Sequence, residues 1–118
     1  MHDPNCLFCK IIAGQIPSRK VYEDEQVFVF HDIHPWAPVH FLIVPKLHLP
    51  SMASVTPEHA DLLGHMMLLA PRLAIEQGCN PYPDGGYRIV VNTGAEGGQE
   101  VHHLHMHVIG GPRPWLRG

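Results

Sequence analysis

The stretch EVHHLHMHVIGG, residues 100–111, places four histidines in a run that otherwise reads as an apolar strand. In a strand, residues two apart point to the same face of the sheet. The spacing therefore predicts that His103, His105 and His107 share one face, while the mostly apolar residues between them point to the other. Neither burial nor solvation requires histidine at every alternate position, so this face indicates a functional site.

Three clustered imidazoles have two main uses, metal binding and nucleophilic or acid–base chemistry. The loop TGAEGGQE, residues 93–100, directly precedes the histidine run, and backbone N–H groups of such a glycine-rich loop can approach an anion closely. A neutral imidazole is a good nucleophile toward phosphorus when its other nitrogen is anchored by an acceptor. His105 has a same-face histidine on either side and is the predicted nucleophile.

Composition narrows the class of protein. The chain has 118 residues, of which 45% are hydrophobic and 16% charged, and this predicts one globular domain over residues 1–118. The formal charge of −3 argues against a general nucleic-acid binder. No stretch approaches the length of a membrane span and the N-terminus does not resemble a secretory signal, so we expect a cytoplasmic protein without a membrane or nucleic-acid partner.

The hydrophobic pattern predicts five strands and two helices. Strands without regular helix alternation favour an antiparallel sheet with helices packed on one side, an α+β fold. Thr56 is the expected N-cap of the longer helix, and Pro71 is expected to kink or locally break it. The expected strands cover residues 20–24, 25–33, 39–46, 87–92 and 100–111, and the expected helices cover 6–14 and 56–78.

Cys6 and Cys9 form a CxxC motif. A redox pair would normally follow a strand, and none is expected here. Two cysteines three apart lie on one face of a helical turn and can chelate one ion, so a metal half-site and two buried thiols both stay open. Cys79 reads as an ordinary small apolar residue.

Several other polar residues have plain interpretations. On the residues alone, Asp32 reads as a solvated residue at a strand end. His31 and His40 are less certain, since they border the elements above. Local hydrogen bonding is the expected role of His2, His34, His59, His65 and His102.

The segment HHLHMHVIGG resembles the His-φ-His-φ-His-φ-φ signature of the histidine triad (HIT) family, where φ is apolar. The resemblance extends over KIIAGQIPS, VYEDEQVFVFHDIHPWAPVHFLIVPKLH and GYRIVVNTGAEGGQEV, and it is closest to bacterial members of the Hint branch that carry CxxC. It implies a five-stranded antiparallel sheet with two helices, paired into a homodimer. It also implies hydrolysis of purine nucleoside 5′-phosphoramidates, such as AMP joined to an amine, through a nucleotidyl-histidine intermediate.

The same resemblance assigns roles to residues. His105 corresponds to the nucleophile, oriented by a backbone carbonyl between triad positions; His107 contacts the α-phosphate and Asp32 holds the ribose hydroxyls. Glu100 stands where eukaryotic Hint proteins have a serine, and we expect it to turn outward because it would repel a phosphate. The expected base pocket comprises Phe8, Ile11, Ile16, Phe30, His31 and Ile33, and the expected phosphate loop comprises Asn92, Gly98 and Gln99, of which Gln99 is also expected to act in catalysis.

The CxxC-containing relatives also imply a zinc ion. Its ligands map to Cys6, Cys9, His48 and His103. Four protein ligands leave no open position for water, so this zinc is expected to be structural.

Two other functions stay open at this stage. One is hydrolysis of dinucleoside polyphosphates, although GGQEV followed by GGPRPW favours the Hint branch. The other is a zinc-stabilised module that binds a nucleotide or a partner, against which the intact triad argues. The C-terminal GGPRPWLRG, residues 110–118, fits either a role in substrate preference or simple packing of Trp115.

Overall fold

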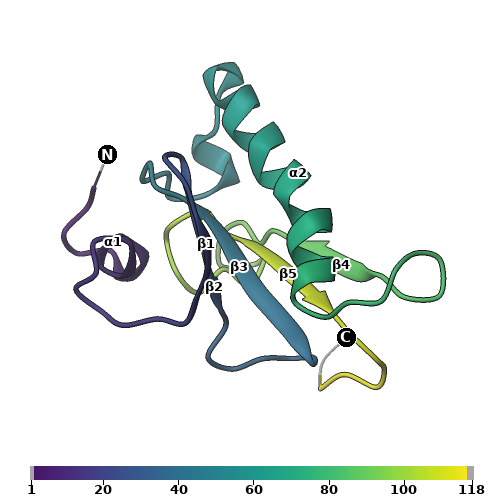
Figure 1. Cartoon of the computed structure of the whole chain (residues 1–118). Coiled ribbons are helices and arrows are strands. Elements are labelled where there is room, and N and C mark those ends of the chain that lie inside the picture. The colour runs from purple at the N-terminus through teal and green to yellow at the C-terminus, as the bar shows by residue number, and fades with distance from the viewer. Residues whose placement is uncertain (1, 117–118) are drawn as a thin grey trace.

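The computed structural model describes residues 2–116, which are built around one antiparallel sheet (Figure 1). Its five strands lie in the order β1-β2-β3-β5-β4, which confirms the expected sheet and helix count. Strand β5 therefore lies between β3 and β4, so the histidine segment enters the middle of the sheet. The strands are β1 (Lys20–Glu23), β2 (Val27–His31), β3 (Val39–Pro45), β4 (Tyr87–Val90) and β5 (Met106–Gly110).

The sheet is covered on both faces. Every residue of β3 is buried, as its continuous apolar sequence indicates. Helix α2 (Ala60–Glu76) packs on one face, where Phe41 and Ile43 of β3 join its apolar side chains, and helix α1 (Leu7–Ile12) packs on the other with Leu42. The expectation that the helices share one side is therefore wrong, because alternate residues of β3 are apolar in both directions and both faces need cover.

Helix α2 follows a 3-10 turn at Pro57–His59. Thr56 is the N-cap of this turn and not, as expected, of α2, whose own N-cap is His59. The Thr56 backbone N–H donates to His59 Nδ1 at 3.0 Å. The helix continues through Pro71 to Glu76, so the proline does not end it. No helix in the part of the chain that the structure describes is long and apolar enough to cross a membrane.

Helix α1 is short and begins at its first cysteine. Cys6 is the N-cap, and its Sγ accepts a hydrogen bond from the Cys9 N–H at 3.4 Å. Gly14 follows the helix with φ of +80°, a conformation that costs glycine little. Phe8 and Ile11 are buried against the sheet, so the helix holds both cysteines close to it.

The histidine strand is shorter than its sequence suggests. β5 begins at Met106, so His103 and His105 lie in the irregular segment before it and only His107 is in the strand. The prediction of one strand over residues 100–111 was wrong here for a local reason. The His103 carbonyl accepts a hydrogen bond from the ring of His105, and such side-chain bonds compete with sheet pairing.

Candidate active site and metal centre

A cavity of about 550 Å³ opens beside the histidine segment. Two of the three triad histidines, His105 and His107, line it together with Asp32 and the glycine-rich loop. Phe8 of α1 and Leu42 of β3 form an apolar part of its wall. A site of this kind, mostly preformed with a few convergent polar groups, is suited to a small ligand.

The imidazole of His105 is held in one tautomer. Its Nδ1 lies 2.7 Å from the carbonyl oxygen of His103, and a carbonyl can only accept, so Nδ1 carries the proton. The neutral ring then has its lone pair on Nε2. Phe8 packs edge-on against the ring with centroids 5.1 Å apart, which fixes its plane. This is the arrangement that a nucleophilic imidazole requires.

A chain of hydrogen bonds fixes His107 in the opposite tautomer. The Trp36 backbone N–H donates to His40 Nδ1 at 3.1 Å, so the proton of a neutral His40 lies on Nε2. That Nε2–H is 2.9 Å from His107 Nδ1, which must accept, so His107 keeps its own proton on Nε2. The Trp36 ring also stacks on His107 at 5.7 Å. His107 can therefore donate a hydrogen bond to an anion.

Burial keeps these imidazoles neutral. It lowers the pKa of His103 to about 4 and that of His107 to about 4. Burial also lowers the pKa of His105 and of His40 below the ordinary histidine value. At pH 7 the rings act as neutral donors and acceptors, which is consistent with the tautomers assigned above.

Two carboxylates act on the cavity. Asp32 follows the end of β2, and its Oδ2 lies 3.4 Å from His40 Nε2, while its Oδ1 accepts from the His34 N–H at 2.7 Å. The negative charges of Asp32 and Glu100 both favour a protonated His105 and so oppose the effect of burial on its pKa. The expectation that Asp32 is merely solvated does not hold, because it lines the cavity.

Gln99 holds the glycine-rich loop in place. Its Nε2 donates to the carbonyl oxygens of Pro50 at 2.7 Å and Val101 at 2.9 Å, and its Oε1 accepts from the Gly94 N–H at 2.9 Å. These bonds occupy both protons of its amide, so the residue positions the loop beside the cavity that it lines.

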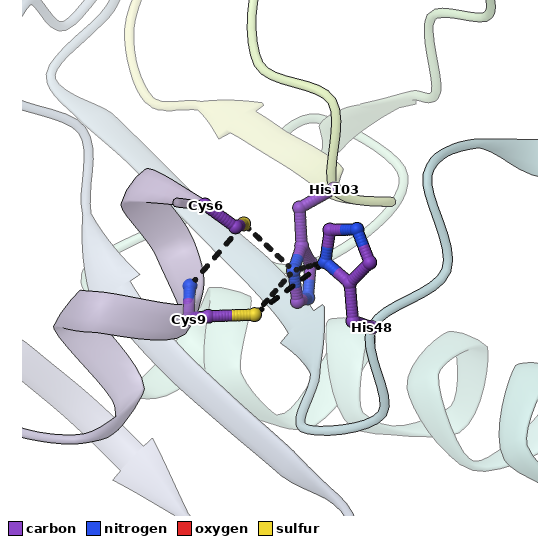
Figure 2. Close-up of side chains that lie close together, drawn as sticks. All are labelled: Cys6, Cys9, His48 and His103. Carbon is purple, nitrogen blue, oxygen red and sulfur yellow. Dashed lines mark hydrogen bonds between the residues drawn. The ribbon is translucent and has the colours of Figure 1, made fainter. Parts of the chain in front are cut away.

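Four side chains converge at a second site next to the cavity (Figure 2). Cys6 and Cys9 come from α1, His48 from the segment after β3, and His103 from the segment before β5. Their nearest ligand atoms, Sγ or Nδ1, all lie within 4.8 Å of one another. This group can hold a metal ion.

Hydrogen bonds and a nearby carboxylate orient the two histidines and Cys9 of this group for metal binding. His103 Nε2 donates to the Pro45 carbonyl at 2.7 Å, which leaves its Nδ1 lone pair toward the cysteines. Asp3 lies beside the other histidine, with Oδ2 3.8 Å from His48 Nε2, and its N–H donates to Cys9 Sγ at 3.4 Å. A ligating histidine commonly has such a carbonyl or carboxylate on its second nitrogen.

Known proteins resemble the chain over nearly its whole length. The family model described as "Scavenger mRNA decapping enzyme C-term binding" matches residues 5–115. A histidine triad protein from Clostridium difficile has a solved structure that superposes with a TM-score of 0.88 at 41% identity, covering 97% of this chain and 96% of that one. The chain belongs to the histidine triad (HIT) family.

Curated relatives of this HIT protein carry more specific names. Protein HitA of Neisseria gonorrhoeae is 49% identical over 108 residues, which cover 92% of this chain and 97% of HitA. The purine nucleoside phosphoramidase of Escherichia coli (strain K12) is 45% identical over 105 residues, which cover 89% and 86% of the two chains. A HIT family hydrolase from Legionella pneumophila has a structure with a TM-score of 0.86 at 43% identity, covering 92% of this chain and 95% of that one.

Other residues assigned by the HIT resemblance lie at varied distances from the cavity. Asn92 and Gly98 line it. Ile11 and Phe30 do not line it but belong to the same buried cluster as Phe8, and Ile16 packs partly buried against that cluster. His31 is half-buried at the end of β2, whereas Ile33 is 85% exposed.

Sequence reasoning on the HIT protein missed His40. The residue is 2% exposed and links Trp36 to His107, yet it lies 67 residues from its triad partner. The one signal available was a histidine inside the apolar run VHFLIVP, where a buried polar group needs a partner.

The C-terminal segment lies at a different cavity, of about 630 Å³, which none of the histidines lines. Arg113 stacks over the Trp115 ring at 3.7 Å and Arg88 at 5.2 Å, and Trp115 Nε1–H donates to the Gly111 carbonyl. In this chain Trp115 packs against its own β4–β5 edge. The last two residues of GGPRPWLRG lie outside the described residues.

Proposed function

We propose that this protein hydrolyses the P–N bond of purine nucleoside 5′-phosphoramidates through a nucleotidyl intermediate on His105. The observation that carries the proposal is the bond from His105 Nδ1–H to the His103 carbonyl, which leaves the Nε2 lone pair free beside a cavity. The purine nucleoside phosphoramidase of Escherichia coli, 45% identical, supports the choice of P–N bond and purine.

The reaction takes two displacements. His105 Nε2 attacks the α-phosphorus, the P–N bond of the substrate breaks, and the departing amine takes up one proton from solvent. Water then attacks the same phosphorus, the bond from phosphorus to Nε2 breaks, and one proton of that water returns to solvent. The products are AMP and a free amine, and His105 is regenerated. Covalent catalysis of this kind divides one difficult step into two easier ones.

Neighbouring groups bind the rest of the nucleotide. His107 Nε2–H donates to a nonbridging oxygen of the phosphate, where charge develops in the transition state. The Asp32 carboxylate accepts from the ribose hydroxyls, and the apolar side chains around Phe8 pack on the base. Residues of the glycine-rich loop, among them Gly98, line the cavity from the other side and would lie against the phosphate.

AMP release from adenosine 5′-phosphoramidate tests the function. The wild type is expected to release AMP, and His105→Asn to lose turnover by at least about 10³-fold, because the nucleophile is gone. The same variant is expected to bind AMP with nearly unchanged affinity. Turnover retained in a folded His105→Asn protein contradicts the proposed nucleophile. A wild type that binds AMP but cleaves only diadenosine polyphosphates, or nothing, identifies one of the two alternative functions.

Zinc is the metal that best suits the second site. Two thiolates and two imidazoles form a common structural zinc donor set. For the usual Zn–N and Zn–S bond lengths, the edges of a tetrahedron measure roughly 3.3–3.8 Å. Cys6 Sγ to His103 Nδ1 is 3.3 Å and Cys9 Sγ to His48 Nδ1 is 3.4 Å, and the two Nδ1 atoms, at 3.1 Å, are slightly closer than such an edge. The residues present fit the ion.

A zinc ion bound here would supply a cross-link, and its four protein ligands would leave no open position for water. Cys6, Cys9, His48 and His103 would hold it, so it would tie α1 to the segments on either side of the catalytic cavity. Burial raises the pKa of the Cys6 thiol, and a bound cation would favour its thiolate. Free thiols of this kind persist in a reducing compartment, which supports a cytoplasmic location.

We also propose that two copies of the chain associate. The HIT resemblance implies a homodimer, and the sheet order leaves β4 as an edge strand. On the outer side of α2, Leu68 is 77% exposed, Ile75 50% and Met67 49%. These exposed apolar side chains on one helix support a partner surface on α2.

A further inference from the structure

The glutamate beside the catalytic cavity has no role in the mechanism above. Glu100 lines the cavity of His105 and His107, and it also lines a second cavity of about 510 Å³. Glu100 and Val101 are the two residues that the cavities share, so they form the wall between them. Glu100 is exposed and at the same time lines both cavities.

The lining of both cavities is acidic. Asp32 lies in the first, Asp3 in the second and Glu100 in both. Neither cavity is lined by a lysine or arginine among the described residues. No cationic side chain in the described part of the chain pairs with the Glu100 carboxylate, so its charge acts on whatever enters the site.

The reaction geometry determines which part of the substrate passes Glu100. In phosphoryl transfer the attacking and leaving atoms lie roughly in line through phosphorus. The leaving group therefore lies on the side of the phosphate away from His105 Nε2, and the nucleoside extends toward Asp32 and Phe8. Loop 92–101 forms the remaining wall, and Glu100 is its one charged side chain that lines the cavity.

We infer that Glu100 selects the leaving group and that the enzyme prefers phosphoramidates whose amine carries a further positive charge, such as a diamine or a basic amino acid side chain. The body of the amine would lie in the second cavity, between Glu100 and Asp3. The same carboxylates repel an anionic leaving group, which includes the nucleotide released from a dinucleoside polyphosphate. This inference rests on the proposed function and specifies its substrate.

Three substrates of equal chain length test the inference. They are AMP joined through nitrogen to 1,3-diaminopropane, to β-alanine amide and to β-alanine, whose free ends are cationic, neutral and anionic. The measured quantity is the ratio of kcat/KM for the cationic substrate to that for the anionic one. The wild type is expected to prefer the cation by about tenfold or more at low ionic strength, and added salt is expected to reduce the ratio.

Matched variants assign the preference to one side chain. Glu100→Gln is expected to lower the ratio by about tenfold, and Glu100→Lys to bring it below one. Glu96→Gln removes an exposed carboxylate from the same loop that does not line the cavity, and it is expected to leave the ratio unchanged. An unchanged ratio in active Glu100→Gln and Glu100→Lys overturns the inference alone. A wild type that cleaves none of the three substrates overturns the proposed function as well.

Discussion

The buried histidines at the cavity carry their ring protons on different nitrogen atoms. His105 donates from Nδ1 and keeps a lone pair on Nε2, whereas His107 accepts at Nδ1 and keeps a proton on Nε2. The difference arises from one backbone carbonyl in the first case and from His40 in the second. Two side chains of the same type thus present a lone pair in one case and an N–H in the other, as the proposed nucleophile and the proposed phosphate donor each require.

His40 is a positioning residue, and its replacement tests the assigned tautomers. His40→Ala removes the Nε2–H donor, so His107 can invert its tautomer, and we expect kcat to fall by at least about tenfold. His40→Gln places an amide N–H near the lost Nε2–H and is expected to recover part of kcat. His34→Asn, at an exposed position nearby, is the control.

Steady-state kinetics, with thermal unfolding to confirm folding, separate the outcomes. Equal kcat for the alanine and glutamine variants, at comparable stability, would show that His40 only fills space.

Single residues also show where sequence patterns suffice. The CxxC spacing alone left a metal half-site and two buried thiols open. The resemblance to CxxC-containing HIT proteins grouped His48 and His103 with the two cysteines, and the structure brings these side chains together. His40 could not be predicted this way. Its partner is supplied by the pairing of β3 with β5, and a contact 67 residues away leaves no local pattern.

Asp24, in the turn between β1 and β2, links the sheet to α2 by a hydrogen bond with His65. Asp24 Oδ1 accepts from the Gln26 N–H at 2.8 Å, and Asp24 Oδ2 accepts from His65 Nε2 at 2.7 Å and from Tyr22 Oη at 2.8 Å. Partial burial alone would raise the pKa of Asp24. The hydrogen bonds from Gln26, His65 and Tyr22 outweigh burial and hold that pKa well below its usual value.

The variant Asp24→Asn tests this contact between the sheet and α2. The amide keeps an acceptor for the turn but loses the charge that faces α2, so we expect a loss of about 1–2 kcal/mol in the free energy of unfolding at pH 7. A depressed native pKa contributes stability that is complete above the unfolded pKa of about 4 and is lost as pH falls below it.

Urea unfolding at several pH values measures this difference. The gap between wild type and Asp24→Asn is expected to shrink as pH falls below about 4. Asp84→Asn, at an exposed loop position, is the control. A gap that is constant down to pH 3 contradicts the assignment.

Element boundaries were predicted less well than element types. Each expected strand is present, but the histidine strand begins at Met106. Before it, the His105 ring bonds the His103 carbonyl and the His103 ring bonds the Pro45 carbonyl. The helices lie on both faces because β2 and β3 are apolar in both directions. The hydrophobic pattern shows which residues of a strand are buried, but it does not show which helix covers each face of the sheet.

Metal content and stability together test the proposed zinc site. Protein purified without chelator is expected to contain one zinc per chain, and so is Cys79→Ala, since Cys79 is buried outside the cluster. Cys9→Ala is expected to lose the metal and about 10 °C or more in Tm, because structural zinc contributes several kcal/mol to folding. A wild type that folds without zinc, or a Cys9→Ala variant of unchanged Tm, contradicts a structural ion.

The proposed dimer is tested by the mass of the particle in solution. Leu68→Glu places a charge among the exposed apolar side chains of α2 and is expected to convert a dimer into a folded monomer, detected by sedimentation equilibrium. Ile33→Glu, which changes a more exposed apolar residue elsewhere, is expected to leave the mass unchanged. A wild type that sediments as a monomer contradicts the proposed association.

One peptide serves both sites. The ring of His103 belongs to the metal cluster, and its carbonyl fixes the proton of His105. Displacement of that ring therefore moves the acceptor on which the nucleophile depends. Coupling between two binding sites is reciprocal. If a bound metal ion strengthens nucleotide binding, a bound nucleotide strengthens metal binding by the same factor. With zinc in the proposed site, a nucleotide in the cavity should thus slow the escape of the ion to a chelator.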